Sequence, residues 1–242
     1  MSGATGQNAG WRLINDGLTL IRIPGGVSAA AAGPRAVWMS DREVSQGLFQ
    51  QFVDDPTWPA EEKPDSWEGP DRDVGDGADY PVQQVSHTDA VLFCNWLSQR
   101  CGMSACYVRM QTADGAEMWV LSAGVAGFRL PTEDEWERAC RWGTTTTFHC
   151  SDDESFLPDY ARISAASTLP VGSLLPNAGG FYDMHGNVME WCEPSNGERV
   201  GEYAVRGGAF LTGPADSESG FSMRFPGTDR YDLAGFRVVL SE

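Results

Sequence analysis

The sequence has few basic residues. Its 242 residues include 17 Lys and Arg against 34 Asp and Glu, which gives a formal net charge of −17 at pH 7. A protein of this charge is repelled by the phosphate backbone of nucleic acids and by an anionic membrane surface. We therefore expect no nucleic-acid partner and no membrane partner.

Long apolar runs are also absent. No window approaches the roughly 18 apolar residues that a membrane-spanning helix needs. The first residues, MSGATGQNAGWRL, lack the basic start and the apolar stretch of a secretion signal. These two absences predict a cytoplasmic protein.

Cysteine is scarce and scattered. Six cysteines are too few for a disulfide framework in a chain of this length, and none has the CxxC spacing of a zinc site. Burial as small apolar side chains is the best interpretation of Cys94 and Cys140. Cys101 and Cys106 are close enough in sequence to pair on oxidation, which spacing alone does not decide.

Glycine, proline and tryptophan are plentiful, with 28, 14 and 9 residues, and this composition suits a loop-rich fold with short strands. No repeat or linker divides the chain, so we predict one domain over residues 1–242. Within it, residues 54–80 form an acidic loop insert, in which ten carboxylates face only Lys63 and Arg72. A solvated loop is the favoured interpretation of this insert, and attraction of a basic partner is the alternative.

Helix caps and turn residues predict the main elements. N-cap residues predict short amphipathic helices after Ser45, after Ser86 and after Thr132, the last with Glu135 completing a capping box. An Asp114-Gly115 pair predicts a hairpin between 106–110 and 118–121. Further apolar runs predict strands over the following ranges: 18–23, 188–192, 203–206 and 236–240.

Five strings follow one another along the chain: PVQQVSHTDAVLFCNWLSQR, GFRLPTEDEWERACRWG, YDMHGNVMEWC, VRGGAF and AGFRVV. In order and approximate spacing they resemble the formylglycine-generating enzymes, the sulfatase-modifying factor family, from Leu18 to Leu240. The resemblance implies an α+β fold of the C-type lectin-like kind, irregular and loop-rich, with short helices against small antiparallel sheets. Arg129, Glu135 and Arg206 lie within apolar parts of these strings, where charge is tolerable only when paired, so we expect structural roles for them.

The DMHGNVME segment is a candidate metal site. Two carboxylates bracket a Gly-Asn turn, and an oxygen-only ligand set suits calcium. In the family this loop binds a calcium ion, which implies Ca²⁺ as a cofactor here, with Asp183, Gly186, Val188 and Glu190 as ligands. The alternative is that Asp183 caps the turn and Glu190 pairs with an arginine.

The family's copper-binding thiol pair is missing. The resemblance places its two cysteines at Thr212 and Ser217, and no cysteine follows Cys192. A hydroxyl cannot replace a thiolate toward Cu(I), so we expect no copper and no catalytic residues for a copper oxidase. An iron variant of the fold uses histidines, but His87, His149 and His185 are dispersed in the sequence and lack the spacing of a facial triad.

The candidate binding surface is the C-terminal segment, residues 206–238. Its central stretch, LTGPADSESGFSMRFPGTDRYDL, is rich in small, polar and aromatic residues, a composition typical of adaptable binding surfaces. Filling the core is the alternative role for Phe210. The candidate ligand-binding residues are Phe210, Thr212, Ser217, Phe221, Arg224, Phe225, Arg230 and Tyr231.

The sequence therefore favours a non-catalytic, copper-less member of the family that binds a protein or small-molecule ligand through its C-terminal loops. One branch of the family carries the variable segment of diversity-generating retroelements in this position, and the segment fits such a region. The alternative is an enzyme: a metal-dependent oxidase or oxygenase, or a divergent formylglycine-generating enzyme acting on a peptide or small molecule. A third hypothesis is an adaptor that works beside effector or signalling partner proteins.

Overall fold

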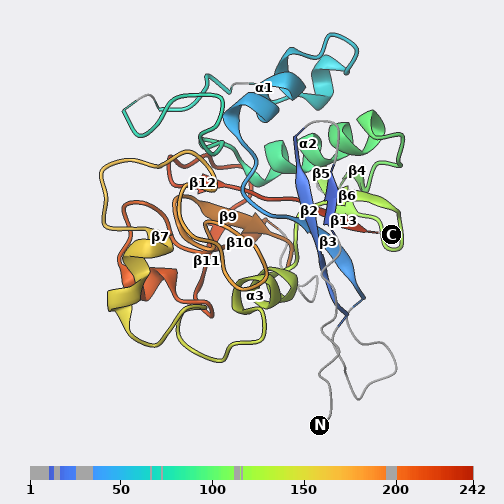
Figure 1. Ribbon diagram of the computed structural model, residues 1–242. Coiled ribbons are helices and arrows are strands. Elements are labelled where there is room, and N and C mark those ends of the chain that lie inside the picture. Colours follow the sequence, from blue (N-terminus) through green and yellow to red (C-terminus); the bar gives the residue numbers. More distant parts are fainter. Residues whose placement is uncertain are drawn as a thin grey trace.

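Two β-sheets and three short helices dominate the computed structural model (Figure 1), which describes residues 11–13, 17–25, 35–65, 67–71, 73–111, 115, 117–194 and 201–241. The first sheet has the strand order β1-β2-β3-β13-β6 and is antiparallel throughout. Its strands are β1 (Trp11–Leu13), β2 (Thr19–Ile23), β3 (Val37–Ser40), β13 (Val239–Ser241) and β6 (Gly127–Arg129). Strand β13, close to the end of the sequence, thus lies between β3 and β6 in the same sheet as β1 and β2.

The second sheet has the order β11-β10-β9-β12. Strands β9 (Met189–Cys192), β10 (Glu202–Arg206) and β11 (Ser222–Pro226) are antiparallel neighbours, and β12 (Ala234–Gly235) runs parallel to β9. Two small ribbons pair β4 (Tyr107–Gln111) with β5 (Glu117–Leu121), and β7 (Ala161–Arg162) with β8 (His185–Gly186). This mixture of short helices and small sheets confirms the predicted α+β fold.

The three predicted helices are confirmed with their caps. Helix α1 (Gln46–Asp54) begins after Ser45, whose side chain accepts from the Leu48 amide. Helix α2 (His87–Arg100) begins with a reciprocal capping box between Ser86 and Asp89, and α3 (Glu133–Arg141) with one between Thr132 and Glu135. Within the described residues, no helix combines the length and the apolar character needed to cross a membrane.

The acidic insert is irregular apart from the 3-10 helix η1 (Ala60–Glu62). Lys63 Nζ donates to the carbonyl of Val53 over 2.8 Å, and Trp67 Nε1 donates to that of Gln83 over 3.1 Å. These bonds pin the loop to the body of the protein. Two further 3-10 helices, η2 (Glu154–Asp159) and η3 (Pro214–Ser217), lie in the C-terminal half. The first ten residues, Arg72 and the hairpin residue Asp114 lie outside the described residues.

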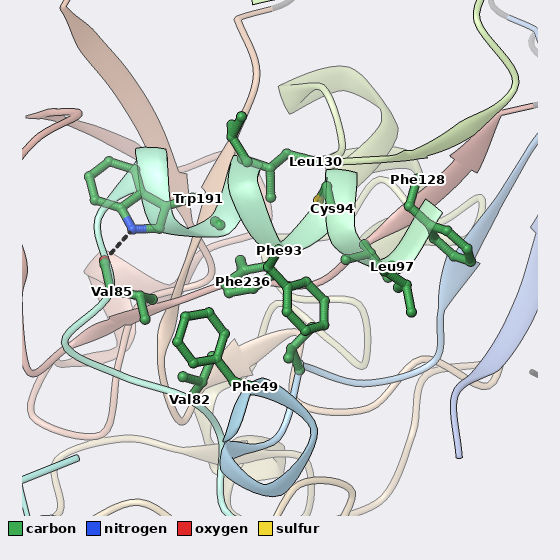
Figure 2. Packing of buried hydrophobic residues seen from close by; sticks show 14 of the residues in the cluster. Phe49, Val82, Val85, Phe93, Cys94, Leu97, Phe128, Leu130, Trp191 and Phe236 are labelled. Carbon is green, nitrogen blue, oxygen red and sulfur yellow. Dashed lines mark hydrogen bonds between the residues drawn. The ribbon is translucent and has the colours of Figure 1, made fainter. Parts of the chain in front are cut away.

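In the core, helices α1 and α2 pack against Phe236 of the AGFRVV string, as Figure 2 shows. The rings of Phe49 from α1 and Phe93 from α2 stack at 5.7 Å, and Phe93 meets Phe236 edge to face at 5.3 Å. Trp191 of β9 is also buried, and its Nε1 donates to the carbonyl of Val85 over 2.9 Å. Burying aromatic rings with one satisfied polar tip stabilises such a core strongly.

The buried charges predicted to be structural are paired. Arg129 binds Glu135 through two hydrogen bonds of 2.7 Å each. Arg206 Nη2 donates to Glu137 on α3 over 2.6 Å. All six cysteines are free thiols, and Cys94 and Cys140 are buried as predicted.

Strand prediction was less accurate in the C-terminal half. Strand β11 was missed, because its side chains alternate little between buried and exposed positions at the edge of the sheet. The predicted strand over 236–240 is β13 only from Val239 onward. Before it, the Val238 amide donates to the Ser40 hydroxyl, and the side chain of Arg237 is buried.

Candidate functional site

The loop after β10 holds the hydroxyls of Thr212 and Ser217, the positions at which the resemblance implies a thiol pair. Gly207 and Gly208 both have positive φ, 91° and 72°, and a Cβ on Gly208 would lie 2.2 Å from Ser217 Oγ and 2.9 Å from Thr212 Oγ1. Only glycine fits there. It lets the loop fold back so that Thr212 Oγ1 and Ser217 Oγ come within 3.3 Å of each other.

Both hydroxyls are used by the loop itself. Thr212 Oγ1 accepts from the amide of Ala209 over 2.9 Å, and Ser217 Oγ donates to the carbonyl of Gly213 over 3.1 Å. The pair is thus a closed structural unit of hard oxygen atoms, which offers no soft ligand for Cu(I).

A stacked histidine pair lies beneath this loop. His185 Nδ1 lies 2.7 Å from the carbonyl of Ser217, and its Nε2 accepts from the His149 amide over 3.1 Å. This assigns the proton of the neutral ring to Nδ1. The two rings stack with centroids 4.7 Å apart. The fold thus brings together two histidines that are 36 positions apart in the sequence.

Burial keeps both of these rings neutral. It lowers the pKa of His185 to about 3, with His149 adding to the effect, and lowers the pKa of His149 to about 4. His87 is placed differently, at the start of α2, where it stacks on Tyr203 with ring centroids 3.5 Å apart. Since both ring nitrogens of His185 already have protein partners, this pair is a structural element of the loop.

Two of the predicted ligand contacts are internal. Phe210 and Ser217 are fully buried, so their side chains do not reach a ligand at the surface. The alternative interpretation of Phe210 as a core residue is what the structure shows. The physical reason is that Phe210 follows the buried turn directly, and its amide donates to the carbonyl of Asn187 over 2.9 Å.

The two predicted arginines tie the segment to helix N-termini. Arg224 of β11 binds Glu133 at the start of α3 over 2.7 Å. Arg230 binds Asp89, the capping residue of α2, through bonds of 2.7 and 2.9 Å. Both guanidinium groups remain partly exposed. They therefore position the loop and leave some of their surface open to solvent.

The predicted aromatic residues Phe225 and Tyr231 are half-buried and lie next to each other at the second sheet. Phe225 and Tyr231 lie with ring centroids 4.4 Å apart, and Phe225 meets the edge of Trp191 at 6.3 Å. Phe221 and Thr212 are also half-buried. The large apolar side chains of the segment that are exposed are Leu211, 59% exposed, and Met223, 36% exposed, and both were missed. In the sequence, these two residues could have been recognised as apolar residues next to polar ones in a segment without strand or helix periodicity.

Buried arginines bracket the whole segment. Arg206, at its start, binds Glu137 and the carbonyls of Ser219 and Gly220. Arg237, at its end, binds Glu190. Residues between Arg206 and Arg237 can therefore be substituted with little effect on how the two ends of the segment are attached.

The predicted calcium ligands are engaged by protein groups. Arg237 donates to both carboxylate oxygens of Glu190, at 2.6 Å each, and Trp136 Nε1 adds a bond of 2.7 Å. Asp183 Oδ2 accepts from the Gly172 amide over 2.6 Å. The pairing of Glu190 with an arginine is thus the alternative weighed from the sequence. As they stand, the carboxylates of Glu190 and Asp183 are held by protein donors and are not free for a calcium ion, and no group of three or more His, Cys, Asp or Glu among the described residues is placed to hold a metal.

Buried negative charge remains around this loop. Glu43, fully buried, accepts from Asn187 Nδ2 over 2.7 Å and from the Val188 amide over 3.2 Å. Burial raises the pKa of Glu43 well above its ordinary value and that of Asp183 to about 6. Burial lowers the pKa of Arg237, but Glu190 outweighs this and raises it.

Comparison with known proteins identifies the scaffold. The model of the sulfatase-modifying factor enzyme 1-like domain matches residues 21–242. The formylglycine-generating enzyme of Mycobacterium tuberculosis is 33% identical over 138 residues, an alignment that covers 51% of this chain and 36% of that protein. The chain thus spans only about a third of the length of the curated relatives it matches first.

Two solved structures share the fold over nearly the whole chain. Treponema denticola variable protein 1 superposes with a TM-score of 0.72 at 24% identity, covering 93% of this chain and 95% of that one. PvdO from Pseudomonas aeruginosa gives a TM-score of 0.73 at 22% identity, covering 97% and 98%.

Proposed function

This chain belongs to the sulfatase-modifying factor enzyme 1-like family, and from that premise we propose that it is a copper-free binding member, which contacts a protein or small-molecule ligand through residues 206–238. The observation that carries the proposal is the hydroxyl pair. Thr212 Oγ1 and Ser217 Oγ lie 3.3 Å apart where the family resemblance places copper-binding thiols. Because each hydroxyl is hydrogen-bonded within its own loop, the copper chemistry has no ligands to use.

The design of the segment supports a binding role. Buried, ion-paired arginines fix its two ends, whereas Leu211 and Met223 expose apolar surface between them. Methionine adapts its shape to different partners, and apolar side chains gain free energy when a ligand covers them. A net charge of −17 disfavours nucleic acid, so a protein or a small molecule is the proposed ligand class.

The fold shared with the Treponema denticola variable protein supports one special case, a variable protein of a diversity-generating retroelement. Such a protein is encoded beside a reverse transcriptase and a near-repeat of its own variable coding segment. We expect both features near the gene, with the repeat covering the codons for residues 206–238. Their absence from the genome would exclude the special case and leave the general proposal intact.

Metal analysis separates the binding proposal from the enzyme alternative. We expect purified protein to hold neither copper nor iron in stoichiometric amount, and to leave a cysteine-containing substrate peptide of a formylglycine-generating enzyme unmodified. One tightly held iron or copper per chain, together with oxygen consumption in the presence of substrate, would establish the oxidase or oxygenase alternative instead.

Affinity capture from the native host tests the binding surface directly. The variant pair Leu211→Asp and Met223→Asp places charge on the protruding side chains of the segment. The matched control is Val108→Asp with Met110→Asp, which changes two similarly exposed side chains on the β4–β5 ribbon. We expect an effector or other partner, or a small molecule, that is captured by wild type and by the control and lost in the first variant. Equal capture by all three proteins would argue against the segment as the binding site.

A further inference from the structure

Residues 183–190 carry the two carboxylates of the predicted calcium site, Asp183 and Glu190. In the structure, Glu190 is paired with the guanidinium of Arg237. Glu190 receives three hydrogen bonds: from Arg237 Nε to Oε2 and Arg237 Nη2 to Oε1, both 2.6 Å, and from Trp136 Nε1 to Oε2 at 2.7 Å. Both members of the ion pair are almost completely buried. The carboxylate is therefore already neutralised.

A calcium ion at this carboxylate would compete with the guanidinium in the observed geometry. Calcium needs six to eight oxygen ligands at about 2.3–2.6 Å. A guanidinium within hydrogen-bond distance of both Glu190 oxygens would repel that ion, and the repulsion is only weakly screened in a buried site. The guanidinium and a calcium ion would therefore compete for the Glu190 carboxylate.

The rest of the loop is closed by direct hydrogen bonds. Asp183 accepts from the amide of Gly172, and Glu43 accepts from Asn187 and from the amide of Val188. The turn conformation is thus specified without a bridging ion. Asp183 and Asn187 adopt positive φ, 58° and 62°, values that Asp and Asn tolerate better than most residues.

Arg237 also uses its remaining donors. Its Nη2 donates to the carbonyl of Tyr182 over 2.9 Å, and its Nη1 lies 3.3 Å from the carbonyl of Ser40 and 3.4 Å from that of Asp41. One planar side chain therefore ties together the end of β3, the residue before the loop, and β9. Gathering several oxygen atoms from separate segments is what a structural cation does.

We propose that the Arg237 guanidinium takes the structural place of the divalent cation, so that this chain folds and stays folded without calcium. The inference goes beyond the proposed function and does not depend on it, because it concerns the scaffold and holds for a binding protein and for an enzyme alike. Because Arg237 lies at the C-terminal end of the binding segment, that end of the segment also holds residues 183–190 in place.

Thermal unfolding of the purified chain with and without calcium tests the proposal. The protein is treated with the chelator EGTA, dialysed, and melted in the presence of either EGTA or 1 mM CaCl₂, while bound calcium is measured by elemental analysis. We expect no retained calcium and midpoints that agree within about 1 °C. If the chain bound calcium, a free calcium concentration of a hundred times the dissociation constant would instead raise the midpoint by about 5–10 °C in a chain of this size.

The variant Glu190→Gln assigns any calcium that is found. Calcium retained at one ion per chain, with a raised midpoint in wild type that is lost in Glu190→Gln, overturns the proposal. Stabilisation that is equal in both proteins places the ion elsewhere and overturns the inference that the chain needs no calcium to stay folded. If Glu190→Gln does not fold, the wild-type measurement decides alone, and one retained calcium whose removal lowers the midpoint overturns the inference. Copper or iron content and partner capture judge the proposed function separately.

Discussion

The arginines at the edges of the C-terminal segment differ from those inside it. Arg237 and Glu190 have side chains 0% and 1% exposed, whereas Arg230 and Asp89 are 24% and 4% exposed, and Arg224 with Glu133 lies further into solvent. All three pairs have similar bond lengths, from 2.6 to 2.9 Å. Their surroundings therefore decide what each contributes: the buried pair fixes the fold, and the partly exposed pairs adjust the position of a loop.

Removing the guanidinium at the buried edge should give the largest effect. Arg237→Met leaves Glu190 buried with only Trp136 as a donor, and such an unpaired charge costs about 3–5 kcal/mol of the free energy of unfolding. Arg230→Met, the matched change inside the segment, should cost about 1 kcal/mol, since its partner also caps a helix and keeps that bond. Urea unfolding of the two variants measures the difference.

A double variant shows whether the cost comes from the unpaired charge. Arg237→Met combined with Glu190→Leu removes both charges together, and it should lose less stability than the sum of the two single changes. Equal losses for Arg237→Met and Arg230→Met would contradict the distinction between the edge of the segment and its interior.

Neighbouring apolar residues in the segment allow the same comparison without charge. Phe210→Ala should lower the free energy of unfolding by about 3–5 kcal/mol, because it opens a cavity in a packed core. Leu211→Ala, one residue later, removes an exposed side chain and should change it by about 0.5 kcal/mol or less. The reverse ranking in urea unfolding would mean that Phe210 faces a ligand, as the sequence first suggested.

The sequence predicted the scaffold well where local chemistry sets the structure. All three helix starts followed from capping residues, since a cap acts within three or four positions. Arg129 and Glu135 were recognisable as structural charges, because charges within apolar strings need partners, and the structure pairs them with each other. The hairpin strands β4 and β5 likewise followed from local alternation and turn residues.

Long-range geometry was beyond the sequence. Nothing in the spacing of His149 and His185 indicates that their rings stack, because the contact depends on how two loops pack. Arg237 was visible inside the GFRVV string, but its choice of Glu190 as partner depends on a turn made 47 positions earlier. The exposed position of Met223 depends in the same way on an edge strand that has no periodic pattern.

The stacked histidines predict how the scaffold responds to acid. Burial holds the pKa of His149 at about 4, below the ordinary value of about 6.5. The unfolded chain therefore binds more protons than the folded one between these pH values, and stability falls as the pH falls through that window. His149→Gln removes one such group, and its stability should fall less steeply, by about 1.4 kcal/mol per pH unit. Urea unfolding from pH 7 to pH 4.5 measures both slopes, and the carboxylates that titrate in both proteins cancel in the difference. Identical slopes would place the His149 ring in contact with solvent.

The hydroxyl pair combines a small expected effect on stability with the most direct change in chemistry. Thr212→Cys with Ser217→Cys replaces two loop side chains by others of similar size and should cost about 1 kcal/mol or less. The two hydroxyl oxygens lie 3.3 Å apart, so the sulfurs are placed to share one ion, and thiolates select Cu(I). We expect the double variant to bind one Cu(I) per chain in a chelator competition under reducing conditions, and wild type and each single variant to bind none with comparable affinity. A double variant that fails to take up copper, while unfolding with unchanged cooperativity, would mean that the loop backbone as well as its side chains has moved away from the metal-binding form. Copper uptake with stability preserved would show that the interior of the segment can be rewritten while the buried arginines hold its ends.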